Sequence, residues 1–134
     1  MCGIVGYIGD KETKEVLYRG LEKLEYRGYD SAGIAVMDQN KINIKKQIGK
    51  LVCLEEDIRN ERMNGKIGIG HTRWATHGKP TIVNAHPHQN CRKSIALVHN
   101  GIIENFQELR EELVKKDHKI ISETDSEVIA HLIS

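Results

Sequence analysis

Cys2 is the first residue whose type and position indicate chemistry. Removal of Met1 would place a free α-amine and a thiol on the same residue. A terminal α-amine has a pKa of about 7.7–8.0, so it can accept a proton near neutral pH, and a thiolate is a strong nucleophile. This is the arrangement of an N-terminal nucleophile, in which the amine serves as the base for its own side chain. The alternative is a small, buried and inert cysteine.

Three further segments carry groups suited to holding a substrate. The segment 71–78 contains Arg73, a fixed cation that suits bidentate binding of a carboxylate. The Asn100 amide and the Gly101 N–H could converge on one point, as an oxyanion hole requires. Asp125 stands where a helix is expected to begin and could bind an ammonium group. The alternatives are a solvated loop, an Asn-Gly turn and an acidic residue that favours the helix dipole.

The histidines also raise a metal hypothesis. His86 and His88 lie close to Cys91 in the sequence. The paired spacing typical of zinc sites, such as Cys-x-x-Cys with His-x-x-x-His, is missing from the sequence. A small metal-binding module on these three residues is therefore the weaker hypothesis. No metal or organic cofactor is expected for the chemistry of Cys2, Arg73 and the other groups above.

The elements that must position these residues are both strands and helices, without internal repeats. Apolar runs predict buried strands at 4–8 and 94–99, a β-hairpin over 33–48 and a short strand at 120–121. Residues 67–71 predict a glycine-rich strand that another backbone or a ligand could approach closely. Helical spacing predicts helices over 11–25, 50–63 and 105–116, and a capping box at 124–127 opening a last helix. Gly20 inside the first helix suggests close packing, and the irregular segment 72–93 suggests a functional loop. Because the early strands are expected to run as consecutive hairpins, the predicted class is α+β.

Composition excludes several other classes of protein. The chain has 134 residues, 39% of them hydrophobic and 29% charged, which is typical of one soluble globular domain. A net charge of +1 argues against binding to nucleic acid or to an anionic membrane surface. No apolar run reaches the roughly 18–20 residues of a membrane span, and the N-terminus lacks the basic region of a signal peptide. The expected compartment is the cytoplasm, where the three cysteines would remain thiols.

Taken together, these segments resemble one enzyme family. The chain is similar to the N-terminal glutaminase domain of the isomerising glutamine–fructose-6-phosphate aminotransferases, also called glucosamine-6-phosphate synthases. The resemblance covers essentially the whole chain. The motifs that carry it, in order, are MCGIVG (1–6), YRGYDSAG (26–33), HTRWATHG (71–78), NAHPH (84–88), HNGIIEN (99–105) and SETD (122–125).

The resemblance implies a fold, a reaction and a set of site residues. The fold is that of the N-terminal-nucleophile (Ntn) hydrolases, a four-layer αββα sandwich. The reaction is hydrolysis of L-glutamine to glutamate and ammonia through a thioester on Cys2. The positions that match the family's site are Cys2 as nucleophile, Asn100 and Gly101 for the oxyanion hole, Arg73 for the α-carboxylate, Asp125 for the α-ammonium, Trp74, Thr76 and His77 for the glutamine pocket, and Arg27 as a conformational support. A zwitterionic substrate does need one cation and one anion, which Arg73 and Asp125 supply.

The resemblance also sets expectations about what surrounds the chain. In the family, ammonia passes to C-terminal isomerase domains that convert fructose 6-phosphate to glucosamine 6-phosphate. Residues 1–134 correspond to the first part of the glutaminase domain, so its later part and the isomerase domains are expected to be absent. The sandwich would then have unpaired edges and an exposed apolar face, which favour association, for example as a homodimer. An inactive fragment that only folds and associates is the main alternative to a glutaminase.

Overall fold

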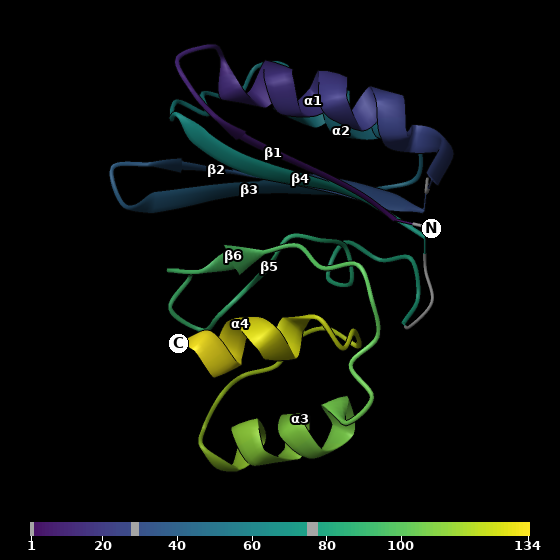
Figure 1. The fold of residues 1–134 in the computed structure, drawn as a ribbon, viewed down its shortest axis with the longest axis vertical. Coiled ribbons are helices and arrows are strands. Elements are labelled where there is room, and N and C mark those ends of the chain that lie inside the picture. Colours follow the sequence, from purple (N-terminus) through teal and green to yellow (C-terminus); the bar gives the residue numbers. More distant parts are fainter. Residues whose placement is uncertain (1, 28–29, 75–77) are drawn as a thin grey trace.

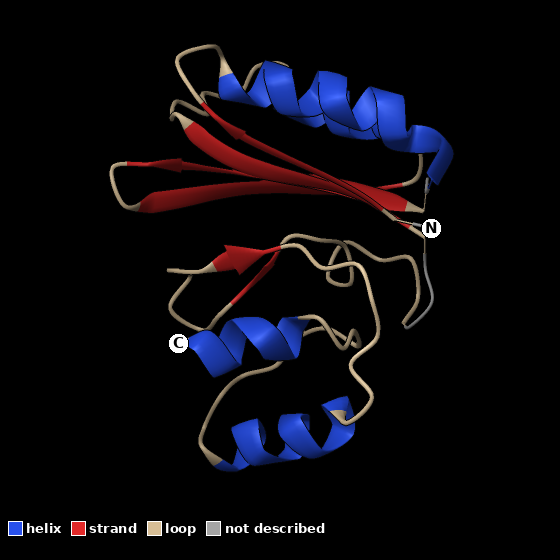
Figure 2. Ribbon diagram, in the orientation of Figure 1, coloured by secondary structure: helices blue, strands red, loops and turns tan. Residues whose placement is uncertain are grey.

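The computed structural model describes residues 2–27, 30–74 and 78–134, which form four layers (Figures 1 and 2). Two helices cover a four-stranded sheet, and on its other side lie a two-stranded sheet and two further helices. The strands are β1 (Gly3–Ile8), β2 (Ser31–Asp38), β3 (Lys41–Ile48), β4 (Ile67–Arg73), β5 (His88–Gln89) and β6 (Ala96–Leu97). The helices are α1 (Thr13–Leu24), the 3-10 turn η1 (Glu25–Arg27), α2 (Leu51–Ile58), α3 (Phe106–Lys115) and α4 (Glu127–Ile133). The predicted α+β class and αββα layering are confirmed.

The four-stranded sheet has the order β1-β4-β2-β3, and every neighbouring pair is antiparallel. Of these strands only β2 and β3 form a hairpin, so the expected run of consecutive hairpins is wrong for β1. The first strand pairs instead with β4, with Gly3 opposite Thr72. Ser31 at the start of β2 lies opposite Arg73 at the end of β4. This register brings the chain entering β1 and the chain leaving β4 to the same end of the sheet.

The main apolar core lies between the sheet and helices α1 and α2. Leu17 and Leu21 of α1 are fully buried against Ile34 and Val36 of β2. A Cβ added at Gly20 would lie 2.8 Å from the Val5 side chain, which confirms the close packing predicted at this glycine. The absence of a side chain on this helix turn therefore lets α1 lie directly on β1.

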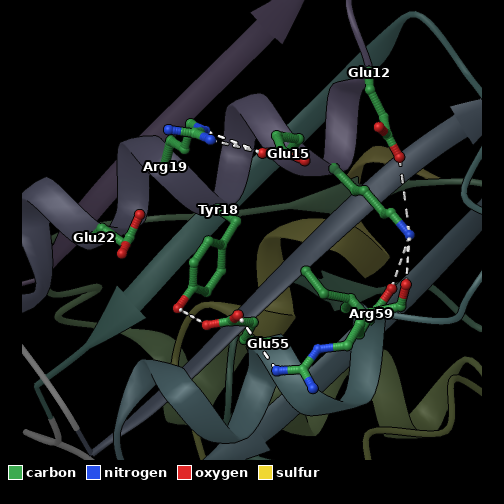
Figure 3. Close-up of a pocket in the computed structure, with 9 residues that line it drawn as sticks. Glu12, Glu15, Tyr18, Arg19, Glu22, Glu55 and Arg59 are labelled. Carbon is green, nitrogen blue, oxygen red and sulfur yellow. Dashed lines mark hydrogen bonds and ion pairs between the residues drawn. The ribbon is translucent and has the colours of Figure 1, made fainter.

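A polar groove on the surface joins α1 to α2 (Figure 3). The Tyr18 hydroxyl donates to a Glu55 carboxylate oxygen at 2.7 Å. Burial and this hydrogen bond raise the pKa of Tyr18 above its ordinary value. The Lys14 ammonium donates to the Ile58 and Glu61 carbonyls at 2.9 and 2.7 Å. These contacts couple α1 to the end of α2, and they indicate a structural role for this groove.

The second half of the chain departs from the sequence prediction in several places. The strand predicted at 94–99 is reduced to the two half-buried residues of β6, and residues 120–121 form no strand. Helix α4 begins at Glu127, but its N-cap Ser126 makes no side-chain capping bond. Instead, the Glu127 carboxylate accepts N–H bonds from Ile121 and Ser122, so the predicted capping box is wrong. The Glu127 carboxylate thus bonds to backbone five and six residues before it, outside the four residues of the predicted box.

The face of the large sheet opposite α1 and α2 changes character along its length. At one end it is apolar and partly exposed: Ile8 is 75% exposed and Ile67 is 40% exposed. The prediction of a buried strand at 4–8 is therefore wrong: Val5 and Tyr7 on the helix-facing side are half-buried, and Ile4 and Ile8 on the other side are exposed. A cavity of about 150 Å³ lies between this end and β6. The exposed apolar face expected from the sequence is present. No helix among the described residues is long and apolar enough to cross a membrane.

Gly33 of β2 lies directly against the segment that precedes β5. A Cβ added there would collide with the backbone carbonyl of His86 and lie 3.0 Å from the Lys46 side chain. The Lys46 ammonium donates to the carbonyls of Ala85 and Pro87, which ties β3 to the same segment. The segment 85–87 is therefore held directly against the sheet by backbone contact.

We expect Gly33→Ala to destabilise the fold by about 1–3 kcal/mol, because the new methyl group overpacks this contact. Gly6→Ala on β1 is the matched control, since an added Cβ meets nothing within 4 Å there. The control should leave the free energy of unfolding unchanged or raise it by up to about 1 kcal/mol. Urea unfolding of both variants measures the difference, and equal stability of the two would contradict the proposed close contact.

Candidate active site

The Cys2 thiol is held by the backbone of Trp74. The Trp74 N–H donates to the Cys2 sulfur at 3.2 Å, and the thiol donates to the Trp74 carbonyl at 3.7 Å. The β1–β4 register explains the contact, because Trp74 is the residue that follows β4. The main chain of Trp74 thus contacts the candidate nucleophile, while its side chain is 45% exposed; the pocket role of that side chain stays a prediction.

Asn100 connects Cys2 to a buried histidine. The Asn100 amide NH₂ donates to the Cys2 carbonyl at 3.0 Å, and the Asn100 Oδ1 accepts from His71 Nε2 at 2.9 Å. Because an amide oxygen only accepts, His71 Nε2 carries the proton. Burial lowers the pKa of His71 to about 4, so its ring is neutral at pH 7. The neutral ring fixes the orientation of Asn100, with its amide donors directed toward Cys2.

Gly101 occupies a backbone conformation that other residues rarely adopt. Its φ is +154°, and an added Cβ would lie 3.0 Å from the His99 ring. The His99 Nδ1 in turn lies 3.1 Å from the Ser126 hydroxyl. Glycine is therefore needed for the chain to turn directly after Asn100. Its assignment to the oxyanion hole stays a prediction.

Arg73 is a buried cation at the end of β4. Its side chain donates to the carbonyls of Gly78 and Lys79 at 3.2 and 3.0 Å, and the residue is 3% exposed. Burial lowers the pKa of Arg73, while electrostatic interactions with Asp30, Cys2, Glu123 and Asp125 raise it. An arginine side chain keeps its charge in proteins. The site therefore contains a fixed positive charge within electrostatic reach of the candidate nucleophile.

Asp125 is buried at the beginning of α4. Its Oδ2 accepts the Ile103 N–H at 2.8 Å, and its Oδ1 lies 3.4 Å from the Ser126 hydroxyl, which donates to it. Its backbone carbonyl accepts the Val128 N–H, inside the first turn of the helix. Asp125 thus holds the segment that follows Gly101 against α4. It also places a carboxylate near Arg73, as a site for a zwitterion requires.

Asn84 links the two sides of this region. Its amide NH₂ donates to the Lys79 carbonyl at 2.9 Å, and its Oδ1 accepts the Glu123 N–H at 2.8 Å. It therefore connects the segment that receives Arg73 to the segment that carries Asp125. Sequence reasoning missed the structural roles of Asn84 and His71. Both residues stand in the motifs that carry the family resemblance, which was the signal available.

Three of the predicted site residues are not placed by the structure. Thr76 and His77 lie outside the described residues. For Arg27 the structure describes the backbone, within η1, and the side chain lies outside the description. Their assignments to the glutamine pocket and to conformational support therefore stay predictions.

Three histidines pack against one another between the sheets. The His71 and His86 rings stack with centroids 4.0 Å apart, and His86 meets His88 edge-on at 4.4 Å. The His88 Nε2 lies 2.9 Å from the Thr124 hydroxyl. Burial lowers the pKa of all three, that of His88 to about 3. The hypothesis of a metal module on His86, His88 and Cys91 is not supported, because Cys91 lies 3.6 Å from His131 Nδ1 instead.

The three buried histidines should make stability fall in acid. An unfolded histidine has a pKa of about 6.5. Above that pH each ring is neutral in both the folded and the unfolded state, so these rings do not make the free energy of unfolding depend on pH. Below that pH the unfolded chain takes up protons that the folded chain binds only near pH 4 or lower. Each histidine then lowers the free energy of unfolding by about 1.4 kcal/mol per pH unit, or about 4 kcal/mol for all three.

Urea unfolding at several pH values between about 7 and 4.5 measures this slope. The variant His88→Gln keeps a hydrogen-bonding group for Thr124 and removes one titrating ring. The three histidines together set one contribution to the slope of unfolding free energy against pH. We expect that contribution to be about one third smaller in the variant. An unchanged slope in the variant would contradict the assignment of the acid sensitivity to buried, neutral histidines.

Comparison with known proteins agrees with this arrangement. Residues 37–134 match the family model described as "Glutamine amidotransferase domain". The chain is 59% identical over 133 residues to the glutamine–fructose-6-phosphate aminotransferases (isomerizing) of Clostridium tetani and of Pyrococcus horikoshii. Each alignment covers 99% of this chain and 22% of the relative, so the chain spans about a fifth of the length of these curated relatives.

A solved structure shares the fold. Glutamine phosphoribosylpyrophosphate amidotransferase from B. subtilis, complexed with ADP and GMP, superimposes with a TM-score of 0.81 at 31% identity. The superposition covers 99% of this chain and 29% of that chain. The four-layer architecture is therefore that of the Ntn amidotransferases, as the sequence predicted. By its family match, its relatives and its fold, the chain belongs to the glutamine amidotransferase domain family.

Proposed function

We propose that this chain hydrolyses L-glutamine to glutamate and ammonia, with Cys2 as the nucleophile once Met1 has been removed. The observation that carries the proposal is the convergence of three groups at one end of the sheet. The Cys2 thiol meets the Trp74 N–H, and the Asn100 amide, oriented by His71, lies against Cys2. A nucleophile beside an oriented amide donor is the minimum that acyl transfer requires.

The reaction has two halves. The α-amine of Cys2 takes the thiol proton, and the thiolate attacks the side-chain amide carbon of glutamine. The negative oxygen that develops is stabilised by the Asn100 amide and the Gly101 N–H. The proton taken from the thiol goes to the amide nitrogen, which leaves as ammonia, and a γ-glutamyl thioester remains on Cys2. Water, deprotonated by the same amine, then attacks the thioester and releases glutamate with a free thiol.

Substrate selection rests on the two buried charges. Arg73 binds the α-carboxylate of glutamine and Asp125 binds its α-ammonium, so that the neutral amide end reaches Cys2. Trp74, Thr76 and His77 line or close this pocket, and Arg27 supports the nucleophile. The buried positions of Arg73 and Asp125, at 3% and 4% exposure, favour the proposal because charges are strongest where water is excluded.

The product ammonia points to further partners. In a longer protein like the curated relatives, we place C-terminal isomerase domains downstream, which would use the ammonia to convert fructose 6-phosphate to glucosamine 6-phosphate. We also place the protein in the cytoplasm, where its cysteines stay reduced. The exposed apolar face favours a homodimer, which sedimentation of the chain would detect.

Incubation with glutamine, followed by an assay for glutamate and ammonia in equal amounts, tests the proposed hydrolysis. Intact mass, measured before and after treatment with a glutamine-like electrophile, reports Met1 removal and Cys2 reactivity together. We expect a chain without Met1 that takes up one label, and glutamine should protect it. A chain that neither turns over glutamine nor takes up the label would favour the inactive fragment instead.

A further inference from the structure

A second cluster of reactive side chains lies away from the glutamine site. Cys91 follows β5, His118 follows α3, and His131 lies in the last turn of α4. The His131 Nδ1 lies 3.3 Å from the His118 Nδ1 and 3.6 Å from the Cys91 sulfur. All three atoms lie within 4.8 Å of one another. Three separate segments thus bring nitrogen and sulfur atoms to one point.

The surroundings orient the ligand atom of His131. The His131 Nε2 lies 2.9 Å from a Glu127 carboxylate oxygen, and both residues are about 2% exposed. Because the carboxylate accepts, the proton on Nε2 is held by Glu127, and Nδ1 is the ring nitrogen that faces Cys91 and His118. A carboxylate that holds the far nitrogen of a histidine is the usual outer-shell arrangement at zinc sites. The Ser122 N–H donates to the other Glu127 oxygen, which keeps the carboxylate in place.

The sulfur is also prepared to act as a ligand. The Lys119 N–H donates to the Cys91 sulfur at 3.2 Å, which fixes the position of the sulfur beside His131. Cys91 is exposed and His118 is half-buried, so an ion can reach the cluster from solvent. The buried His131 supplies the fixed ligand, and the other two can adjust around it.

The spacing of the three atoms agrees with one metal geometry. Tetrahedral zinc, with bonds of about 2.0–2.1 Å to nitrogen and about 2.3 Å to sulfur, separates two nitrogens by about 3.3 Å and a nitrogen and a sulfur by about 3.5 Å. The observed separations from His131 are 3.3 and 3.6 Å. The third separation, between the Cys91 sulfur and the His118 nitrogen, can reach the value for zinc through a side-chain movement at the surface. Nitrogen and thiolate ligands select zinc-class ions over magnesium or calcium.

We propose that Cys91, His118 and His131 bind one zinc-class divalent ion, with water as the fourth ligand. The ion would join the loop after β5, the end of α3 and the end of α4. The site is separate from the proposed glutamine site and does not depend on that proposal.

Titration of the chelator-treated chain with Co²⁺ tests the site directly. Tetrahedral Co²⁺ bound to a thiolate gives an intense sulfur-to-cobalt charge-transfer band, and one ion per chain should saturate it. Zn²⁺ should displace the Co²⁺ and raise the temperature of unfolding. Cys91→Ser should abolish the charge-transfer band. His118→Asn should weaken Co²⁺ binding by more than the roughly 10–100-fold that loss of an outer-shell partner costs.

Two control variants separate this site from other thiols. Cys53→Ser removes an exposed cysteine on α2, and Cys2→Ser removes the thiol beside the N-terminal amine. Both controls should keep the band and the affinity for Co²⁺. Circular dichroism should give the same fold for Cys91→Ser and His118→Asn, since neither residue belongs to the buried core. No charge-transfer band, or a band lost in Cys2→Ser and retained in Cys91→Ser, would overturn the proposal.

Discussion

Cys2→Ala should abolish glutamine hydrolysis, lowering kcat by a factor on the order of 10⁴–10⁶. The reason is that no other atom in the site can form the thioester. The fold should be unaffected, because Cys2 is half-buried and the variant keeps the Cys2 backbone carbonyl that accepts from Asn100. Coupled detection of glutamate measures the loss, and intact mass after the glutamine-like electrophile measures the label that the variant fails to take up.

Cys53→Ala is the matched control for this prediction, because Cys53 is an exposed thiol on α2. It should keep full activity and one label per chain. A chain produced with Met1 still attached should lose activity while it keeps the thiol, since its amine is then an amide. Turnover that survives in Cys2→Ala would exclude Cys2 as the nucleophile.

The local elements of the fold were predictable from the sequence. Helices α1, α2 and α3 and the β2–β3 hairpin form from residues close together in the chain, so the periodicity of their side chains was enough to predict them. The pairing of β1 with β4 was not, because more than sixty residues separate Gly3 from its partner Thr72. The capping box failed for a different reason. The Glu127 carboxylate accepts bonds from the 121–122 backbone, five and six residues before it, which lies just outside the four-residue pattern.

The candidate site was likewise predictable only in part. Cys2, Arg73, Asn100 and Asp125 could be named from their motifs, and the structure brings them to one end of the molecule. The part of His71 in orienting Asn100 depends on a contact across the fold. The metal cluster was missed because its three ligands lie 13 and 40 residues apart, from His131 to His118 and to Cys91. Only the packing of α3, α4 and the loop after β5 brings them together.

Strand β4 shows how one element serves both fold and site. Its alternate residues Ile67, Ile69, His71 and Arg73 share the face turned away from α1, and they change from apolar to charged along the strand. Gly70 lies on the other face, where an added Cβ would be 3.2 Å from Leu21 of α1. The strand is therefore packed tightly against the helix layer while its last residues face the opposite side. Rigid packing on one face is what allows polar groups on the other to be held in place.

Asn100→Ala should lower kcat by about 100–1000-fold, the cost of losing one oxyanion-hole donor. KM for glutamine should change little, because the proposed contacts of the charged ends of the substrate are with Arg73 and Asp125, not with Asn100. Asn100→Asp tests the same point with less change in shape. Its carboxylate can still accept from His71 Nε2, but it cannot donate to an oxyanion, so it should be as inactive as the alanine variant.

His71→Gln should give a loss of kcat smaller than that of Asn100→Ala, because His71 acts only by positioning Asn100. A glutamine NH₂ can still donate to the Asn100 Oδ1, so we expect a smaller loss of kcat than in Asn100→Ala, again with little change in KM. A small thiol reagent should still modify Cys2 in all three variants, which separates lost oxyanion stabilisation from a disordered nucleophile. A large rise in KM in Asn100→Ala, with kcat unchanged, would place Asn100 in substrate binding and contradict its role at the oxyanion.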